Sequence, residues 1–405
     1  MPRQPYLKFN YFSGKTLHLG VCGSVAAYKT LELLRAWKDV GIKVTVTLTP
    51  AAGEFVTPMS YLSLGASKVY GPMMEIDDIF AHLEPGQKAD AMLIMPATAS
   101  TISRLAGGDA SEMLAAQALA FDRPKVIAPA MHPRMWMNPA TQANWELLLE
   151  RGFIPVNPGC GLMACGDSGE GRLAPLLDIY LESLRALAEQ DMSGQTLLVT
   201  IGPTREFWDG VRFVSNPSSG LMGAALASAA WVRGARVKAV CGPGVPALPR
   251  GVERFDVNSA AEMLDACESV WSESTVGCFA AAVCDYRPAD QGSEKLKKES
   301  LGEAPVLKLA KNPDIAALLG ETKTTSQRSI VFAAETSNLK ANALKKLASK
   351  NADMIVANTV GLPGLGFESE DNQVSLLDNE NGVLDLPVMS KADIAWKIWD
   401  VFLKH

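Results

Sequence analysis

The chain has 405 residues, of which 48% are apolar and 20% charged, and its formal net charge is −6. This length exceeds what one ordinary hydrophobic core holds, so we expect two or three globular domains of α/β composition. The acidic balance argues against broad non-specific binding of nucleic acid, because that mode needs a basic surface that displaces counterions.

The seven cysteines are an odd number, and no Cys-x-x-Cys pair occurs among them. This usage is typical of a reduced intracellular chain. The amino-terminal residues contain neither an apolar core segment nor a small-residue cleavage site, as a secretion signal would. No uncharged apolar run reaches the roughly 20 residues of a membrane span. We therefore expect a cytoplasmic protein that binds no membrane.

Short β-rich runs alternate with helical segments along the first half of the chain. We expect a strand at 15–22, a helix at 25–40, and further strands at 43–49, 90–95 and 125–130. Such alternation predicts a parallel sheet covered by helices on both faces, with ligands bound at the carboxyl ends of its strands.

The same pattern restarts after a helix that begins near Leu176 and a polar stretch at 189–194. The elements expected in this second half are strands at 195–201, 235–241, 276–283, 329–334 and 353–357, a helix at 221–233, a hairpin near 373–386 and a helix from Ser390. We place the boundary near residue 190, which predicts one α/β domain at 1–189 and another at 190–405.

The first expected strand runs into Gly-Val-Cys-Gly-Ser-Val at 20–25, where a helix opens. Backbone N–H groups at such a turn bind phosphate, although an ordinary tight turn has the same composition. The third glycine of the dinucleotide fingerprint is missing, and the second strand ends at Thr49 instead of an acidic residue that would hold a ribose. The loop therefore favours a mononucleotide such as FMN, with Thr49 beside its phosphate.

Three later segments support a flavin site: PATAS at 96–100, PAMHPRMW at 129–136 and ACGDSGEGR at 164–172. The last is either a flexible connection or, as its length and glycine content favour, a lid over a substrate. Together the segments resemble the flavin-containing cysteine decarboxylases, which implies a flavodoxin-like parallel-sheet domain. The resemblance implies that FMN contacts Gly23, Ser24, Val25, Thr49, Thr98, Ser100 and Met131.

The same resemblance assigns the catalytic residues of this half. His82 in Ala-His-Leu-Glu occupies the position of the family's catalytic histidine, and Cys165 that of the cysteine on the substrate-covering loop. A lone histidine is more often structural, so this role depends on the resemblance. His132 stands where the family usually has an asparagine that holds the substrate carboxylate. Because imidazole also donates a hydrogen bond, we expect His132 to bind substrate.

The chemistry explains the need for a flavin. An N-acylcysteine carboxylate does not lose CO₂ readily, because the carbanion left behind has nowhere to delocalise. A flavin that takes electrons from the thiol-bearing carbon and later returns them removes this obstacle. The resemblance implies that His82 assists the first part and that Cys165 supplies a proton in the last reduction.

In the second half, Gly-Pro-Thr-Arg-Glu ends the first strand and Asn-Pro-Ser-Ser-Gly at 216–220 opens a helix. Asparagine and serine commonly cap helices, but Arg205 and Arg212 nearby favour a bound phosphate or carboxylate. The run resembles the Asn-x-Ser-Ser-Gly-Lys motif of phosphopantothenate–cysteine ligases, with Leu221 in place of the lysine, and this resemblance implies a Rossmann-like ligase domain. It implies that Asn216 holds the substrate or its acyl intermediate.

Further motifs of the ligase family follow at 280–288 (AAAVCDYRP), 311–315 (KNPDI) and 332–336 (FAAET). The charge run at 294–298 has the composition of a solvated face, yet Lys295 aligns with the family lysine needed for ligation. The resemblance implies substrate contacts at Arg205, Arg212 and Ala282, and nucleotide contacts at Asp285, Lys295, Asn312, Pro313, Asp314, Ile315, Phe332, Lys346 and Lys350.

Together the halves resemble the bacterial bifunctional phosphopantothenoylcysteine decarboxylase/phosphopantothenate–cysteine ligases over nearly the whole chain. The resemblance implies CTP-dependent ligation of 4′-phosphopantothenate with cysteine through an acyl-cytidylate, then FMN-dependent decarboxylation to 4′-phosphopantetheine, in coenzyme A biosynthesis. It also implies Mg²⁺ and a homo-oligomer, a dodecamer of decarboxylase trimers and ligase dimers. Residue spacing does not distinguish CTP from ATP. The alternatives are a ligase whose front domain is impaired or redirected by His132, and a front half that is an FMN-binding regulatory module.

Overall fold

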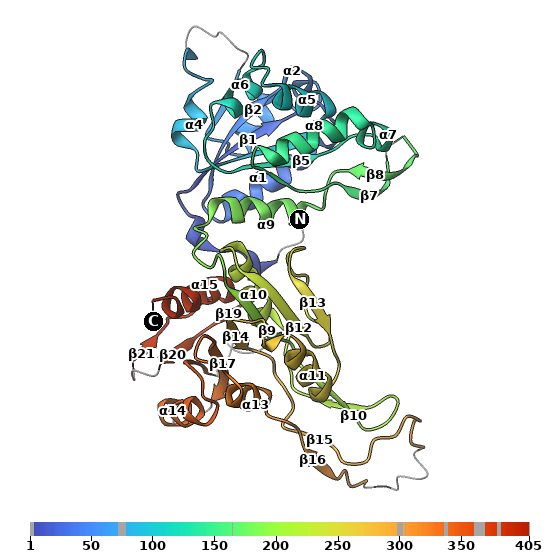
Figure 1. The fold of residues 1–405 in the computed structure, drawn as a ribbon, viewed down its shortest axis with the longest axis vertical. Helices are drawn as coiled ribbons and strands as arrows, with labels where there is room; N and C mark the ends of the chain where they lie inside the picture. Colours follow the sequence, from blue (N-terminus) through green and yellow to red (C-terminus); the bar gives the residue numbers. More distant parts are fainter. Residues whose placement is uncertain are drawn as a thin grey trace. The chain divides into compact units, whose positions relative to one another are not determined.

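The computed structural model describes residues 4–71, 78–163, 165–297, 303, 305–335, 339–359, 369–378 and 382–404. The chain divides into two compact units (Figure 1). The described part of the first unit runs from Asn10 to Glu189, and that of the second comprises Gln4–Phe9 and the residues from Gln190 onward. The segment Gln4–Phe9 thus packs with the unit that is remote from it in sequence.

The first unit is built on a six-stranded parallel sheet in the order β3-β2-β1-β4-β5-β6. Its strands are β1 (Thr16–Val21), β2 (Lys43–Leu48), β3 (Lys68–Tyr70), β4 (Ala91–Ala97), β5 (Lys125–Pro129) and β6 (Phe153–Pro155). From the central pair β1–β4, the strand order continues to β2 and β3 on one side and to β5 and β6 on the other. This is the strand order of the dinucleotide-binding doubly wound fold, and ligands bind where it reverses.

Burial explains why periodicity located these strands. Every residue of β4 is buried, as expected for a central parallel strand with helices on both faces.

The helices of the first unit are η2 (Asn10–Phe12), η3 (Val25–Tyr28), α1 (Lys29–Asp39), α2 (Pro50–Gly53), α3 (Pro58–Ser63), α4 (Glu84–Lys88), α5 (Ala99–Gly107), α6 (Met113–Leu119), α7 (Pro133–Trp136), α8 (Pro139–Glu150) and α9 (Leu176–Leu187).

Two local expectations for this unit differ from the structure. The helix expected at 25–40 opens as the 3₁₀ turn η3 before α1 begins at Lys29. From Ser168 to Arg172, the segment expected as a glycine-rich loop is the strand β8 (Ser168–Arg172), which forms an antiparallel hairpin with β7 (Gly159–Leu162). Glycines at unusual backbone angles hid this strand, because its composition is typical of a loop.

The second unit has an eight-stranded sheet in the order β13-β12-β9-β14-β17-β18-β20-β21. The strands from β13 to β18 are parallel, whereas β20 pairs antiparallel with β18 and with β21, so the expected terminal hairpin is present. The strands are β9 (Thr196–Ile201), β12 (Arg236–Cys241), β13 (Glu253–Asp256), β14 (Val276–Phe279), β17 (Arg328–Glu335), β18 (Met354–Thr359), β20 (Val374–Asp378) and β21 (Val383–Asp385).

Helices and three small two-stranded sheets complete this unit. The helices are η1 (Pro5–Leu7), α10 (Leu221–Val232), α11 (Ala260–Trp271), α13 (Ile315–Glu321), α14 (Leu339–Ser349) and α15 (Lys391–Phe402). The small sheets are β10 (Arg205–Phe207) with β11 (Phe213–Ser215), β15 (Tyr286–Pro288) with β16 (Leu309–Lys311), and β19 (Asp371–Asn372) with β22 (Met389–Ser390).

Helix α10 lies at the centre of the second unit, and its residues from Gly223 to Val232 are all buried. The amino-terminal segment covers part of this core, since the Phe9 ring centroid lies 5.4 Å from that of Trp396 and the Tyr6 hydroxyl donates to the Ala247 carbonyl at 2.7 Å. In the part of the chain that the structure describes, no helix combines the length and apolar character needed to cross a bilayer.

Candidate functional site

A cleft of about 750 Å³ lies at the carboxyl edge of the first sheet. It is formed by the turns that follow β1, β2, β4 and β5, which meet at the point where the strand order reverses. Of the expected flavin contacts, Val25 is not among the lining residues. The others line the cleft: Gly23, Ser24, Thr49, Thr98, Ser100 and Met131.

Short polar residues shape these turns. The hydroxyl oxygens of Ser24, Thr49 and Thr98 accept hydrogen bonds from the backbone N–H groups of Ala26, Ala52 and Thr101, at 3.3, 3.3 and 3.4 Å. Each residue therefore ends a strand connection and starts a helical turn.

A close approach of backbone requires Gly23 in this cleft. A Cβ at position 23 would overlap the Cβ of Ala51, at the start of α2. Two βα turns are thus held in contact, with several backbone N–H groups gathered along one edge. Hydroxyl groups and backbone N–H donors suit a phosphate-bearing mononucleotide.

His82 lies outside this set of lining residues, in the turn before α4. The turn is anchored at Ala81, whose carbonyl accepts from the buried Gln117 amide at 2.9 Å. On the other side of His82, hydrogen bonds from Lys68 and Lys88 lower the pKa of Glu84 to about 2. The structure therefore fixes the backbone on both sides of His82 without placing it in the described cleft.

The hairpin β7–β8 brings Cys165 to His132. The His132 Nε2 atom lies 2.7 Å from Asp167 Oδ2, and the ligand atoms of His132, Cys165 and Asp167 all lie within 4.8 Å of one another. Cys165 and Cys160 are exposed, whereas the other five cysteines are buried. For Cys22, burial raises the pKa to about 12, so that thiol stays protonated.

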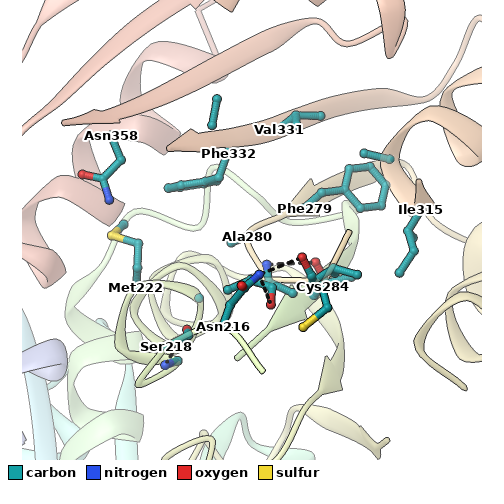
Figure 2. Close-up of a pocket in the computed structure, with 18 of the residues that line it drawn as sticks. Asn216, Ser218, Met222, Phe279, Ala280, Cys284, Ile315, Val331, Phe332 and Asn358 are labelled. Atoms are coloured by element: carbon teal, nitrogen blue, oxygen red, sulfur yellow. Dashed lines mark hydrogen bonds between the residues drawn. The ribbon is translucent and has the colours of Figure 1, made fainter. Parts of the chain in front are cut away.

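A second cavity, of about 490 Å³, lies in the second unit (Figure 2). It lies at the carboxyl ends of the parallel strands β9, β14, β17 and β18, as the first cleft does in its own sheet. The expected residues that line it come from five separate segments: Asn216, Ala282, Asp285, Asn312, Pro313, Asp314, Ile315, Phe332, Lys346 and Lys350.

Asn216 is held against the loop that follows β14. Its Nδ2 atom donates to the Val283 carbonyl at 3.0 Å, and Figure 2 shows this side chain beside Cys284. Gly220 then takes a φ of 70°, which lets α10 begin directly after the Asn-Pro-Ser-Ser-Gly run. The start of α10 and the 280–285 loop therefore form one wall of the cavity.

A buried amide joins the opposite wall. Asn312 donates through Nδ2 to the Cys284 carbonyl at 2.9 Å and accepts from Arg287 Nη1 at 3.2 Å. Lys350, directly after the end of α14, pairs with Asp314 at 3.1 Å, and Lys346 on that helix lines the same cavity. This wall therefore presents lysine ammonium groups to any polyanion that enters.

Several lining residues were not expected from the sequence, among them Met222, Asn358, Asn372 and Lys391. Asn358 is 9% exposed and, among the residues that the structure describes, its Oδ1 atom has no hydrogen-bond partner, so the cavity offers an unused acceptor there. Burial lowers the pKa of Lys391 to about 8. Asn358 lies at the carboxyl end of a predicted strand, and that position was the signal that could have found it.

Three expected ligand residues lie outside the lining. Arg212 pairs with the buried Asp209 at 2.9 Å, and the Arg205 guanidinium lies 4.7 Å from the Phe213 ring centroid. Lys295 belongs to a segment anchored by the Leu296 N–H, which donates to Asp209 at 3.2 Å. None of the three lines the cavity, although the pairing of Arg205 with Ser215 brings Arg205 near the residue before Asn216. Of the quoted motif residues, Ala164, Lys298 and Thr336 lie outside the described residues.

In comparisons with known proteins, the two halves of the chain match two different families. The chain matches the family profiles described as "Flavoprotein", over residues 11–187, and "DNA/pantothenate metabolism flavoprotein C-terminal domain", over residues 192–405. It is 38% identical over 390 residues to the coenzyme A biosynthesis bifunctional protein CoaBC of Vibrio parahaemolyticus, covering 95% of this chain and 97% of that protein. With the Escherichia coli K12 protein of the same name it shares 39% identity over 368 residues, covering 90% and 91%.

Among solved structures, the crystal structure of the C-terminal domain of a coenzyme A biosynthesis bifunctional protein CoaBC is 36% identical, with a TM-score of 0.46, and covers 53% of this chain and 97% of that one. The full-length relatives match both halves of the chain in one alignment. The chain therefore belongs to the family of bifunctional coenzyme A biosynthesis proteins, in which a flavoprotein decarboxylase half is joined to a phosphopantothenate–cysteine ligase half.

Proposed function

We propose that residues 190–405 join 4′-phosphopantothenate to cysteine with CTP, and that residues 1–189 decarboxylate the product with FMN to 4′-phosphopantetheine. The observation that carries the proposal is the second-unit cavity, which gathers Asn216, Asp285 and Lys346 from three remote segments of the chain. Family membership supplies the reaction class, and the cavity supplies residues suited to it.

Ligation needs a carboxylate whose oxygen becomes a good leaving group. In our proposal Asn216 holds the substrate carboxylate at the mouth of the cavity, where its own amide is fixed by Val283. Lys346 and Lys350 would lie beside the nucleotide phosphates, and together with a Mg²⁺ ion brought by the nucleotide they would neutralise its negative charge. Attack on the nucleotide then forms an acyl-cytidylate and releases pyrophosphate, and the cysteine amine displaces the nucleotide.

Decarboxylation belongs to the cleft of the first unit. The hydroxyl-lined turns at Ser24, Thr49 and Ser100 fit the phosphate of FMN, and Gly23 keeps their backbones close. Bound FMN would supply a two-electron acceptor that later returns the pair. The chain itself contributes His82 as the base for the first part and Cys165 as the proton donor for the last. Each transfers a proton that water would otherwise have to carry.

We also propose a homo-oligomer, with the dodecamer as the expected assembly. Large apolar side chains are exposed near the flavin cleft, including Val25 at 61%, Phe55 at 53% and Met59 at 68%. Apolar side chains gathered in this way are typical of surfaces covered by another subunit. In that assembly Val25 would reach the cofactor of a neighbouring copy.

The test combines a spectrum with product analysis. The absorption spectrum of purified full-length protein is recorded first, and phosphopantothenate, cysteine and CTP or ATP are then added with mass detection of products. We expect a flavin spectrum, CMP from CTP, CO₂ release and phosphopantetheine. Phosphopantothenoylcysteine that accumulates while flavin is bound would overturn the decarboxylase half and favour a ligase with an impaired front domain. ATP turning over faster than CTP would overturn the nucleotide assignment.

A further inference from the structure

The hairpin β7–β8 ends in a compact turn that carries Cys165. The Met163 N–H donates to the Asp167 carbonyl at 2.7 Å, and the Gly166 N–H donates to the Met163 carbonyl at 3.0 Å. Both bonds are local to the turn. The position of the turn therefore depends on contacts from outside it.

Two bonds fasten this hairpin to the segment after β5. Near the base, the Met131 N–H donates to the Gly171 carbonyl at 2.9 Å, and a Cβ at position 171 would lie only 2.5 Å from the Met131 carbonyl oxygen. At the tip, His132 contacts Asp167 at 2.7 Å. The second bond acts directly on the turn, since Asp167 lies two residues from Cys165 and Met131 lines the flavin cleft.

The hydrogen bonds determine which imidazole nitrogen carries the proton. The Arg134 N–H donates to Nδ1 of His132 at 3.2 Å, because His132 caps helix α7. An accepting Nδ1 has no hydrogen, so in the neutral ring Nε2 carries it and donates to Asp167. Both nitrogens are then engaged, and no N–H remains for a substrate carboxylate. An anionic Asp167 beside the ring would also repel such a carboxylate.

The same hydrogen bonds argue against metal binding at His132, Cys165 and Asp167, although these residue types are common zinc ligands. A metal on Nε2 needs that nitrogen's lone pair, which moves the proton to Nδ1. Nδ1–H would then face the Arg134 N–H, donor against donor. The hydrogen-bonded pair satisfies both ring nitrogens of His132, whereas a metal on Nε2 does not.

We propose that His132 is a positioning residue: through Asp167 it holds the turn that presents Cys165, and it does not bind the substrate carboxylate. The asparagine usual at this position has a shorter side chain. Its Oδ1 atom can cap α7, but its Nδ2 atom does not extend as far toward Asp167 as Nε2 of an imidazole. The proposal rests on the decarboxylation proposed above, because Cys165 is its proton donor.

A double-mutant cycle tests the pair in the full-length flavin-loaded protein. The variants are His132→Asn, Asp167→Ala and both together, and Glu170→Ala is the control, an exposed acidic residue on the same hairpin. We expect each single variant to lower kcat for CO₂ release about tenfold, the size of a lost charged hydrogen bond, with KM nearly unchanged. The double variant should lose no more than either single one, and the control should match the unaltered protein.

A second readout does not depend on turnover. In a Cys160→Ser background, alkylation of Cys165 by iodoacetamide is followed by mass spectrometry. We expect both single variants and the double variant to be alkylated several-fold faster than the unaltered chain, and by the same factor, because each releases the same turn. The Glu170→Ala control should keep the slow rate.

Three results would overturn the proposal. One is a raised KM with unchanged kcat in His132→Asn while Asp167→Ala is silent, which would make His132 a carboxylate ligand. Another is additive losses in the cycle. The third is protection of Cys165 by equimolar Zn²⁺ in the native chain but not in His132→Asn, which would assign a metal site. Absence of CO₂ release from the unaltered flavin-loaded chain would instead overturn the proposed function, and alkylation would still decide the pairing.

Discussion

The side-chain amide of Gln117 donates a 2.9 Å hydrogen bond to the backbone carbonyl of Ala81, the residue directly before His82. Gln117 is fully buried, and its Oε1 atom accepts from the Thr47 hydroxyl at 2.7 Å. A polar network inside the first unit thus fixes the start of the turn that carries the expected catalytic histidine. Decarboxylation should therefore depend on a residue that contacts neither substrate nor cofactor.

We predict that Gln117→Leu slows decarboxylation about tenfold, because it removes the donor to Ala81 and costs roughly 1–3 kcal/mol for the unpaired carbonyl. Ligation by the same preparation should be unchanged, since its residues lie in the other unit. Separate assays of CO₂ release and of phosphopantothenoylcysteine formation check this. An equal loss of both activities would show that the variant unfolds the chain, and an unchanged decarboxylation rate would show that the bond has no part in placing His82.

Gly23 offers a direct test of the flavin cleft. We expect Gly23→Ala to lose most bound flavin, because the new Cβ would overlap Ala51 and force two cleft turns apart. Gly53→Ala, at the end of α2, is the matched control, since a Cβ there meets nothing within 4 Å. Flavin absorbance per mole of purified protein measures the effect. Full flavin content in Gly23→Ala would place the cofactor elsewhere.

The buried His18 makes stability depend on pH. Burial lowers its pKa to about 4 from the usual 6.5, while its ring nitrogens contact Thr45 at 2.8 Å and Gln117 at 3.1 Å. The unfolded chain therefore binds more protons than the folded chain between about pH 6.5 and 4. Stability from this group is complete above pH 6.5 and falls by up to about 3 kcal/mol as the pH drops through that window.

Urea unfolding at several pH values checks this prediction against a His18→Gln variant. We expect the free energy of unfolding of the first unit to fall more steeply between pH 7 and 5 in the native chain than in the variant. The variant has no group at position 18 to protonate there. Carboxylate titrations affect both proteins alike, so the difference between the two curves isolates His18. Parallel curves would mean that His18 binds a proton as readily in the folded chain as in the unfolded chain.

Lys346 and Lys345 are adjacent on α14, but only Lys346 lines the ligase cavity. We expect Lys346→Ala to raise the KM for CTP about tenfold or more, because one ammonium opposite a phosphate is lost. Lys345→Ala, exposed beside it, should leave the KM unchanged. Initial rates of CMP formation at varied CTP, at low and raised salt, measure both. Equal effects of the two substitutions would indicate only general electrostatic attraction.

Local pattern predicted much of the fold. Strands such as Thr16–Val21 and Thr196–Ile201 were expected to within about one residue, because a buried parallel strand is a short apolar run that needs no knowledge of its partners. The strand expected at 276–283 ends at Phe279, where the backbone leaves the sheet to form a cavity wall. Pattern does not show where a chain leaves a sheet, because small apolar residues continue into the loop.

By itself, the sequence determined the α/β fold class and the two units, because periodicity and turn chemistry act between near neighbours. Most of the expected site residues at the strand ends came from the family resemblance of their motifs. Tertiary structure alone decided which remote groups meet. It paired His132 with Asp167, placed Asn358 and Lys391 in the ligase cavity, and left Arg212 bound to Asp209 outside it. Most of these contacts join residues far apart along the chain, and the Arg212–Asp209 pair depends on the conformation of one loop. The same composition permits many other pairings, and packing selects among them.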